Sequence, residues 1–152
     1  MNLRNRLPFG VAVVTAFTLG VAGPAYAGSV TGIWGYYGPQ AGISYQNQNA
    51  VYTNGPSGPE YAYTTASTQG GNAPAGYMGV TTRLYAAATG FMWADNGPSY
   101  SSGNIVSMSL PAGNSTDLHQ YFYAKGLTYA YNGNGYNTYE SFQSPNIFGD
   151  SN

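Results

Sequence analysis

The chain has 152 residues, with 16 tyrosines, 22 glycines and no cysteine, and only four Lys or Arg and five Asp or Glu side chains. Without residues 1–27, which are considered next, two cations remain against five carboxylates, a net charge of about −3. Two isolated cations cannot form the basic patch that binding to nucleic acid or to an anionic membrane surface requires. With no cysteine there is no disulfide, so packing alone must hold the fold together.

Residues 1–27 have the organisation of an export signal. Two arginines precede an apolar stretch from Leu7 to Val21, and small residues lead to Ala27. Proline and glycine interrupt this stretch, and it is shorter than the roughly 20 residues of a membrane-spanning helix. We therefore predict cleavage after Ala27 and secretion of residues 28–152 into the extracellular space, with no remaining membrane segment.

The remaining 125 residues predict one all-β domain, either a single antiparallel β-sandwich or a flattened barrel. Apolar residues recur with period two in short runs that glycine, proline and asparagine interrupt, so we expect about eight short strands and almost no helix. A chain of this length buries enough surface for one core only. In chain order, the expected strands are 30–37, 43–45, 51–54, 60–67, 77–86, 91–94, 105–110, 118–131 and 136–142.

The clearest strand is the one from Tyr77 to Ala86. Its two faces differ in character, because alternate side chains point to opposite sides of a sheet. The face expected in the core carries Met78, Val80, Leu84 and Ala86, and the face expected in solvent carries Tyr77, Thr81, Arg83 and Tyr85.

Turn residues predict the connections. The two Asn-Gly pairs between Tyr131 and Tyr136 favour a hairpin that pairs the flanking strands. Gly126 predicts a bulge or bend inside the long element 118–131. The sequence Asn-Gly-Pro-Ser occurs at 54–57 and again at 96–99, which indicates reuse of one turn type. Residues 69–74 and the tail after Pro145 have no strand pattern, and we expect both to be mobile.

Two sequence blocks carry a resemblance. Residues 72–79 read Asn-Ala-Pro-Ala-Gly-Tyr-Met-Gly and run on to Arg-Leu-Tyr at 83–85, and residues 131–139 read Tyr-Asn-Gly-Asn-Gly-Tyr-Asn-Thr-Tyr and are followed by Ser-Pro at 144–145. Both are similar to blocks in small secreted proteins of Gram-positive bacteria that carry no assigned activity. The resemblance implies a bacterial, extracellular origin and no mechanism.

Aromatic residues recur two positions apart, which places both rings on one face of a strand about 6.6 to 6.8 Å apart. Exposed rows of such rings suit sugar rings or a protein partner, whereas buried or cross-strand rings stabilise a sheet. The amide run 46–49, expected in a loop, would favour sugar. The candidate surface-binding residues are Trp34, Tyr36, Tyr61, Tyr63, Trp93, Tyr129 and Tyr131.

Catalytic and metal chemistry has little support in the sequence. A glycosidase would need two of the carboxylates across a cleft, and the single histidine, His119, has only Asp117 as a nearby acid. One histidine and no cysteine cannot complete a zinc site, so we expect no metal and no cofactor. Arg83 is a possible polar anchor for a ligand. The alternative role for Arg83 is a structural ion pair with Glu60 or Glu140. Either of these carboxylates is also a possible partner for Lys125.

These patterns favour a secreted noncatalytic β-sandwich that binds neutral polysaccharide, cell wall or another surface through an aromatic and amide-rich face. One alternative is a structural or self-assembling matrix protein, since low charge leaves little repulsion between copies. Another is an exported inhibitor or toxin-like effector that binds one protein partner. A hydrolase has the weakest support.

Overall fold

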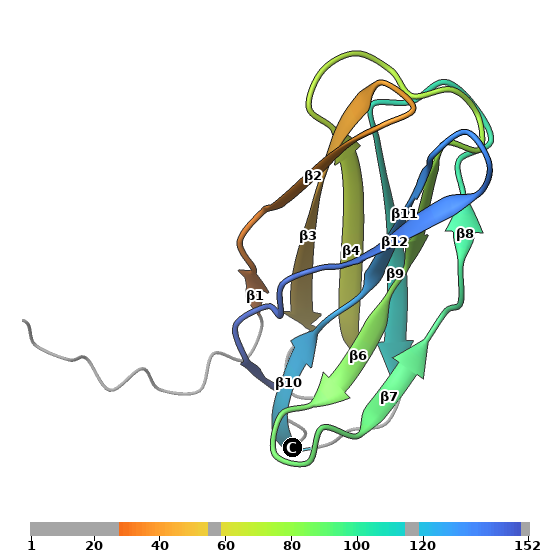
Figure 1. The fold of residues 1–152 in the computed structure, drawn as a ribbon. Helices are drawn as coiled ribbons and strands as arrows, with labels where there is room; N and C mark the ends of the chain where they lie inside the picture. The colour runs from red at the N-terminus through yellow and green to blue at the C-terminus, as the bar shows by residue number, and fades with distance from the viewer. Residues whose placement is uncertain (1–27, 55–58, 115–118, 150–152) are drawn as a thin grey trace, which may run out of the picture.

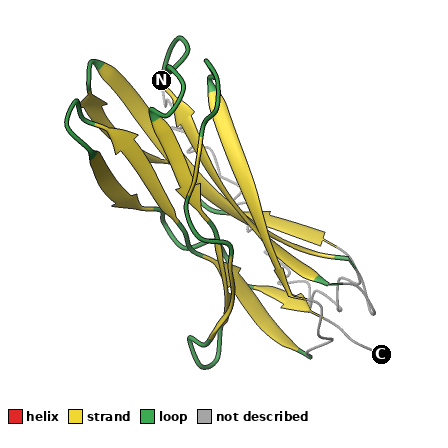
Figure 2. Ribbon diagram, turned by 90° about the vertical axis from the view of Figure 1, so that its right-hand side faces the viewer, coloured by secondary structure: helices red, strands yellow, loops and turns green. Residues whose placement is uncertain are grey.

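The protein forms two packed layers of antiparallel strands (Figure 1). The computed structural model describes residues 28–54, 59–114 and 119–149, which contain thirteen strands and no helix. Figure 2 shows only strands, turns and loops in these ranges. The all-β, sandwich-like class predicted from the sequence is confirmed. The expected export signal, residues 1–27, lies outside the described residues, as does the turn at 55–57.

The first layer is one five-stranded sheet. Its strands are β1 (Gly28–Thr31), β2 (Gly35–Gln40), β3 (Ile43–Thr53), β4 (Glu60–Thr68) and β9 (Ser107–Asn114). The order is β1-β3-β4-β9. Strand β2 pairs with the same edge of β3 as β1 does: β2 lies along the first half of β3 and β1 along the second half. A tight turn at Ala41 and Gly42, both with positive φ, joins β2 to β3, and the sequence analysis did not predict this hairpin.

The second layer consists of two four-stranded sheets placed end to end. One has the order β13-β10-β6-β7 and the other the order β12-β11-β5-β8. Their strands are β5 (Met78–Thr81), β6 (Arg83–Ala86), β7 (Met92–Asp95), β8 (Ser99–Tyr100), β10 (Gln120–Ala124), β11 (Leu127–Tyr131), β12 (Tyr136–Glu140) and β13 (Ile147–Gly149). The strands predicted at 77–86 and 118–131 therefore each cross from one sheet to the other. These breaks are one reason why the strand count exceeds the eight expected.

The break between β5 and β6 falls at Thr82. Its backbone N–H donates to Asn96 Oδ1 at 2.9 Å, and its hydroxyl donates to the Leu110 carbonyl at 2.6 Å. The same hydroxyl accepts a hydrogen bond from the Thr64 N–H at 3.0 Å. The Asn96 side chain thus supplies an acceptor for the Thr82 N–H, and the Thr82 hydroxyl bridges a backbone donor of β4 and a backbone acceptor of β9, so these groups keep the partners that a buried backbone requires.

The break between β10 and β11 lies at Gly126, where the sequence predicted a bend. A Cβ atom at this position would overlap the Thr64 hydroxyl and the Thr81 carbonyl, so only glycine fits. The Ser141 hydroxyl bonds to both the N–H and the carbonyl of Gly126, and the Ala124 N–H donates to Ser144 Oγ. The predicted bend is confirmed, and two serines satisfy the backbone around it.

The interior contains two apolar clusters separated by a polar layer. One cluster includes Tyr45, Ala66, Met78, Val80 and Ala130, and the other includes Val51, Ala62, Leu84, Phe122 and Ala124. On the strands that contribute to both clusters, the inward positions between them are polar or glycine: Asn47 and Asn49 on β3, Thr64 on β4, Thr82 before β6, and Gly126 and Thr128 at β11. Because the strand breaks leave backbone groups without ladder partners here, polar side chains fill this level of the core.

Three local predictions need correction. Thr81 is buried, at 1% exposure, and its hydroxyl lies 3.0 Å from the Tyr129 phenol, so it is not on a solvated face. Residues 46–49 lie in the middle of β3 and form no loop. Part of the tail, Ile147–Gly149, pairs with β10 as β13 and buries Ile147.

Other local predictions are confirmed. Leu84 is fully buried, and β11 and β12 form the hairpin predicted at 131–136, closed by a hydrogen bond from the Asn132 N–H to the Gly135 carbonyl. Lys125 pairs with Glu140 at 2.8 Å, one of the expected pairings. Arg83 pairs instead with Asp95, its neighbour on β7, at 2.8 Å.

Candidate functional site

The structure separates the seven aromatic candidates into four places. Tyr61 and Tyr63 lie on β4, in the first layer, and Tyr129 and Tyr131 lie on β11, in the second. Trp93 lies on β7 beside Phe91, with ring centroids 5.0 Å apart. Trp34 and Tyr36 lie at the start of β2, where they line a groove. The candidates do not form one continuous row.

The groove runs between β2 of the first layer and β12 of the second, and we call it the β2–β12 groove. Its volume is about 370 Å³. Five aromatic residues line it, namely Trp34, Tyr36, Tyr37, Tyr139 and Phe142, together with Gly35, Asn47 and Glu140. Tyr36 and Phe142 are 67% and 54% exposed, so their rings are available to a ligand.

Stacked rings fix the two walls of the groove relative to each other. The Tyr37 and Tyr139 rings lie 3.9 Å apart between centroids and 20° from parallel. The Tyr37 phenol donates to Thr128 Oγ1 at 2.9 Å, and burial raises the pKa of Tyr37 to about 12 despite that bond. Further along, the Asn137 amide donates to Gln40 Oε1 at 2.6 Å. These contacts hold the edges of β2 and β12 in place, so the groove is preformed.

Asn47 lies under the groove and is 1% exposed. Its Nδ2 donates to Thr128 Oγ1 at 3.0 Å, and the Thr128 hydroxyl already accepts from Tyr37. The amide oxygen points toward Gly35: a Cβ on Gly35 would lie 2.6 Å from it. Within the described part of the chain, Asn47 Oδ1 accepts no hydrogen bond, and such a buried acceptor in a native protein calls for a reason.

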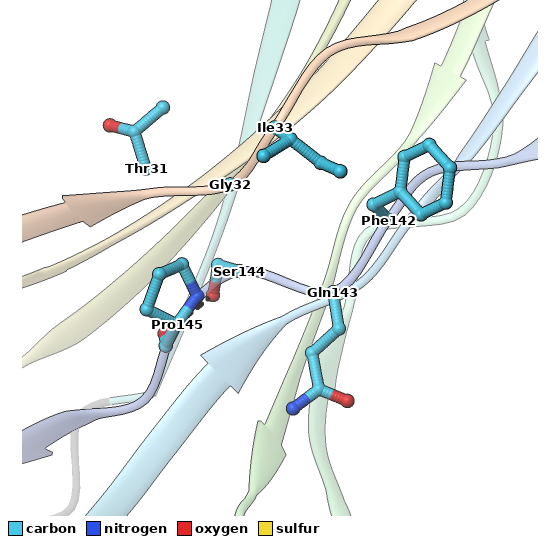
Figure 3. A pocket seen from close by; sticks show the side chains of 7 residues that line it. All are labelled: Thr31, Gly32, Ile33, Phe142, Gln143, Ser144 and Pro145. Atoms are coloured by element: carbon cyan, nitrogen blue, oxygen red, sulfur yellow. Dashed lines mark hydrogen bonds between the residues drawn. The ribbon is translucent and has the colours of Figure 1, made fainter.

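A second depression adjoins the groove at Phe142, which lines both. Figure 3 shows the residues that line this second depression. It has a volume of about 490 Å³ and we call it the Ile33 depression. One side is formed by Thr31 at the end of β1 and by Gly32 and Ile33 after it, and the other by residues 142–145 after β12. Gly32 permits the close approach of the two segments, because a Cβ there would lie 3.3 Å from the backbone of Gln143 and Ser144.

Charged groups contribute little to either depression. Among the described residues, Glu140 is the only charged one that lines them, and Lys125 pairs with it at 2.8 Å. The bond to Glu140 raises the pKa of Lys125, and the bond to Asp95 raises the pKa of Arg83. The predicted anchor Arg83 is therefore held in an ion pair on β6 and does not line the groove. Both depressions offer a ligand mainly neutral groups.

Two of the remaining candidate rings, Tyr61 and Tyr129, cover the backbone of the sheets, whereas Tyr63 packs against Tyr52, and Tyr131 lines a depression of about 260 Å³ with Tyr77 and Tyr136. Tyr61 lies over Gly113, where a Cβ would be 2.6 Å from the Tyr61 ring. Tyr100 lies over Gly79 in the same way. The Tyr129 ring also lies close to Gly79, and its centroid is 5.7 Å from the centroid of the Tyr100 ring. These contacts are structural, in the manner of aromatic rings that protect glycine in sheets.

Trp93 lies in a third depression, of about 410 Å³, with Ala86, Thr89, Phe91 and Gln120. Its indole Nε1 is buried and donates no hydrogen bond to the described residues. Phe91 beside it is 58% exposed. This surface is apolar and has only one amide, so it offers a sugar fewer polar groups than the groove does.

Sequence reasoning identified Trp34 and Tyr36 and missed Asn47, Tyr139 and Phe142. The amide run 46–49 did carry a signal, but alternation along β3 points only Asn47 and Asn49 inward. Phe142 follows the end of β12 and belongs to no aromatic pair. The groove joins residues 34–37 to residues 139–142, a separation of about one hundred positions that no local pattern reveals.

Comparison with known proteins adds no relative: no family model, no curated protein and no solved structure matches the chain. The resemblance to secreted Gram-positive proteins therefore stays a prediction. The ranges 28–54, 59–114 and 119–149 contain no apolar helix of membrane-spanning length. Over the same ranges, His, Asp and Glu side chains nowhere gather in groups of three that could hold a metal ion. Asp117, the expected neighbour of His119, lies outside them.

Proposed function

We propose that this protein is a secreted, noncatalytic carbohydrate-binding domain that holds a neutral sugar in the β2–β12 groove. The observation that carries the proposal is the combination of exposed rings with one buried acceptor. Trp34, Tyr36 and Phe142 line the groove, and Asn47 Oδ1 beneath it accepts no hydrogen bond from the described residues. Ligand sites typically combine an aromatic lining with a small number of placed polar groups.

A neutral sugar matches this lining on each count. One face of a sugar ring is apolar and packs against an aromatic ring, while its hydroxyls bond to phenols and amides at the edges. Glu140 is compensated by Lys125, and none of the described residues that line the groove is a cation that could attract an acidic sugar. The walls are held by the Tyr37–Tyr139 stack, and a rigid site loses less entropy on binding than a mobile one.

The test uses the intrinsic fluorescence of tryptophan. The chain has two tryptophans, so a Trp93→Phe background leaves Trp34 in the groove as the sole reporter. Titration with soluble neutral oligosaccharides, and sedimentation with insoluble neutral polysaccharides and purified cell wall, should reveal binding. Trp34→Ala, read by calorimetry in the wild-type background, should weaken that binding at least about tenfold, as loss of a central aromatic anchor does.

The matched control is Tyr61→Ala, which removes a ring from the outer face of β4. It should bind as the wild type does. Absence of binding to every neutral glycan would refute the proposal, and loss of binding in Tyr61→Ala with retention in Trp34→Ala would move the site to the five-stranded sheet.

Self-assembly is a second candidate function, and one observation favours it. Among the described residues of the five first-layer strands, the only charged side chain is Glu60, which is buried. An uncharged sheet face gives little repulsion between copies. Light scattering over a concentration series measures this directly, and a constant monomeric mass would exclude self-assembly.

A further inference from the structure

The β2–β12 groove and the Ile33 depression are parts of one surface. Phe142 lines both of them, and the residues on the facing side, Ile33 and Trp34, are consecutive in the chain. Figure 3 shows the two segments, with Ile33 on one and Phe142 to Pro145 on the other. A ligand that lies in the groove and extends past Phe142 therefore enters the Ile33 depression.

Buried side chains hold the Ile33 depression in shape. Asn49, which is fully buried, donates from Nδ2 to the Phe142 carbonyl at 2.8 Å and to Ser141 Oγ at 2.7 Å. The Asn49 carbonyl accepts from the Gly32 N–H at 2.7 Å, and Gln48 donates to the Gly32 carbonyl at 2.8 Å. Strand β3 thus bonds to both sides of the Ile33 depression through the polar layer of the core. The Ile33 depression and the β2–β12 groove are therefore held at a fixed position relative to each other.

The chemistry of the Ile33 depression matches that of the groove. Its apolar groups are Ile33, Phe142 and Pro145, its polar groups are hydroxyls and one amide, and no charged side chain is found among its described lining residues. Ile33 is 67% exposed although it is a large aliphatic side chain. Neither depression is enclosed, so a polymer could enter and leave at either end.

From these observations we infer that the site binds a neutral oligosaccharide over at least two consecutive sugar units, one in the β2–β12 groove and the next in the Ile33 depression. Phe142 contacts both units. This inference rests on the proposed function and specifies its ligand as the interior of a neutral polysaccharide chain, not a single sugar. Volumes of about 370 and 490 Å³ each fall in the range of single ligand sites, roughly 300 to 1,000 Å³, so a ligand that fills both exceeds one ring.

The test is a chain-length series. Three sets of soluble oligosaccharides, made of β-1,4-linked glucose, α-1,4-linked glucose or β-1,4-linked N-acetylglucosamine and containing one to six units, are titrated into the Trp93→Phe protein. In the set that binds, affinity should rise about tenfold or more from one unit to three or four and then reach a plateau. Ile33→Ala should lower affinity severalfold for the longer chains and leave affinity for the single sugar unchanged. Trp34→Ala, read by calorimetry in the wild-type background, should lower affinity at every length.

The outcomes separate the two proposals. Equal affinity for one unit and six, or an equal loss at every length in Ile33→Ala, would overturn the two-unit site and leave the groove proposal standing. No binding of any set, at any length, together with none to the insoluble polysaccharides, would overturn both. Because the Ile33 side chain is exposed, Ile33→Ala should keep the wild-type unfolding midpoint, and Gln143→Ala gives a second variant of the same depression.

Discussion

The aromatic rings at the β2–β12 groove and the rings on the outer faces of the sheets have similar chemistry, but their surroundings differ. On the outer faces, Tyr61 lies over Gly113 and Tyr100 lies over Gly79. At the groove, Tyr36 and Phe142 extend into solvent beside a buried amide. What lies beneath a ring therefore separates a ring that protects the sheet from one that a ligand can reach.

The sharpest test of this difference is Tyr129→Ala on the outer face. The ring packs over Gly79, and its phenol lies 3.0 Å from the buried Thr81 hydroxyl. Its removal should destabilise the protein by about 3 kcal/mol, from lost packing and an unsatisfied hydroxyl, and should leave glycan binding unchanged. Urea unfolding with a constant slope measures the loss. Tyr129→Phe, which keeps the ring, should cost about 1 kcal/mol, and an equal cost for both variants would contradict the packing role.

Alkaline pH tests the buried anchor of the groove wall. Tyr37 has a pKa of about 12 in the folded protein, against about 10 when unfolded. The folded protein holds the Tyr37 proton more tightly than the unfolded chain does. The contribution of Tyr37 to the free energy of unfolding is therefore complete below pH 10 and is lost as the pH rises toward 12. Stability should fall by about 2 kcal/mol from this group over that window.

The control for the pH experiment is Tyr37→Phe. Burial also raises the pKa values of Tyr45 and Tyr100, so this variant should lose stability more gently with pH rather than become insensitive. Chemical unfolding at pH 8, 10 and 12 gives the comparison. The same decline in both proteins would show that Tyr37 is not the group responsible.

Gly35→Ala tests structural packing and the surface of the β2–β12 groove with one variant, because the new methyl group changes both. The new methyl group would lie 2.6 Å from Asn47 Oδ1 and 3.4 Å from the Phe142 ring. We expect a cost of about 1 to 2 kcal/mol from overpacking and weaker glycan binding, since Asn47 must shift. Gly103→Ala, where a Cβ meets nothing within 4 Å, is the matched control, and unchanged binding in Gly35→Ala would remove Asn47 from the site.

The smallest effect on stability is expected for Tyr36→Ala. Tyr36 is 67% exposed, so its truncation should change the free energy of unfolding by less than about 0.5 kcal/mol while lowering glycan affinity severalfold. Thermal unfolding and fluorescence titration of one preparation test both statements. A large loss of stability with normal binding would place Tyr36 among the structural rings.

Local patterns predicted those features whose causes lie close together in the chain. The Asn-Gly pairs predicted the hairpin at 131–136, because its turn needs residues that accept positive φ. Gly126 predicted the bend between β10 and β11. Period two predicted that Leu84 points inward, and it is fully buried.

The same patterns failed where the cause lies on a distant strand. Thr81 has the alternation of an exposed residue, but Tyr129 reaches its hydroxyl from β11. Nothing near Thr82 predicts a strand break, because Asn96 and Leu110 supply the bonds that stabilise it. For the candidate site, the aromatic spacing identified Trp34 and Tyr36, whereas Asn47 and Phe142 became part of it only through the pairing of β2 with β3 and the approach of residues 141–145.

The sequence by itself determined the character of the surface and the class of the fold. Scarce charge, no cysteine and short alternating runs are properties of composition and period, and they restrict the protein to an all-β domain with few charged side chains. Only the tertiary structure decided which rings remain exposed. Contacts between residues far apart in the chain produce the strand breaks at Thr82 and Gly126, the polar layer around them and the approach of β2 to β12. Those contacts therefore determine the position and shape of the β2–β12 groove.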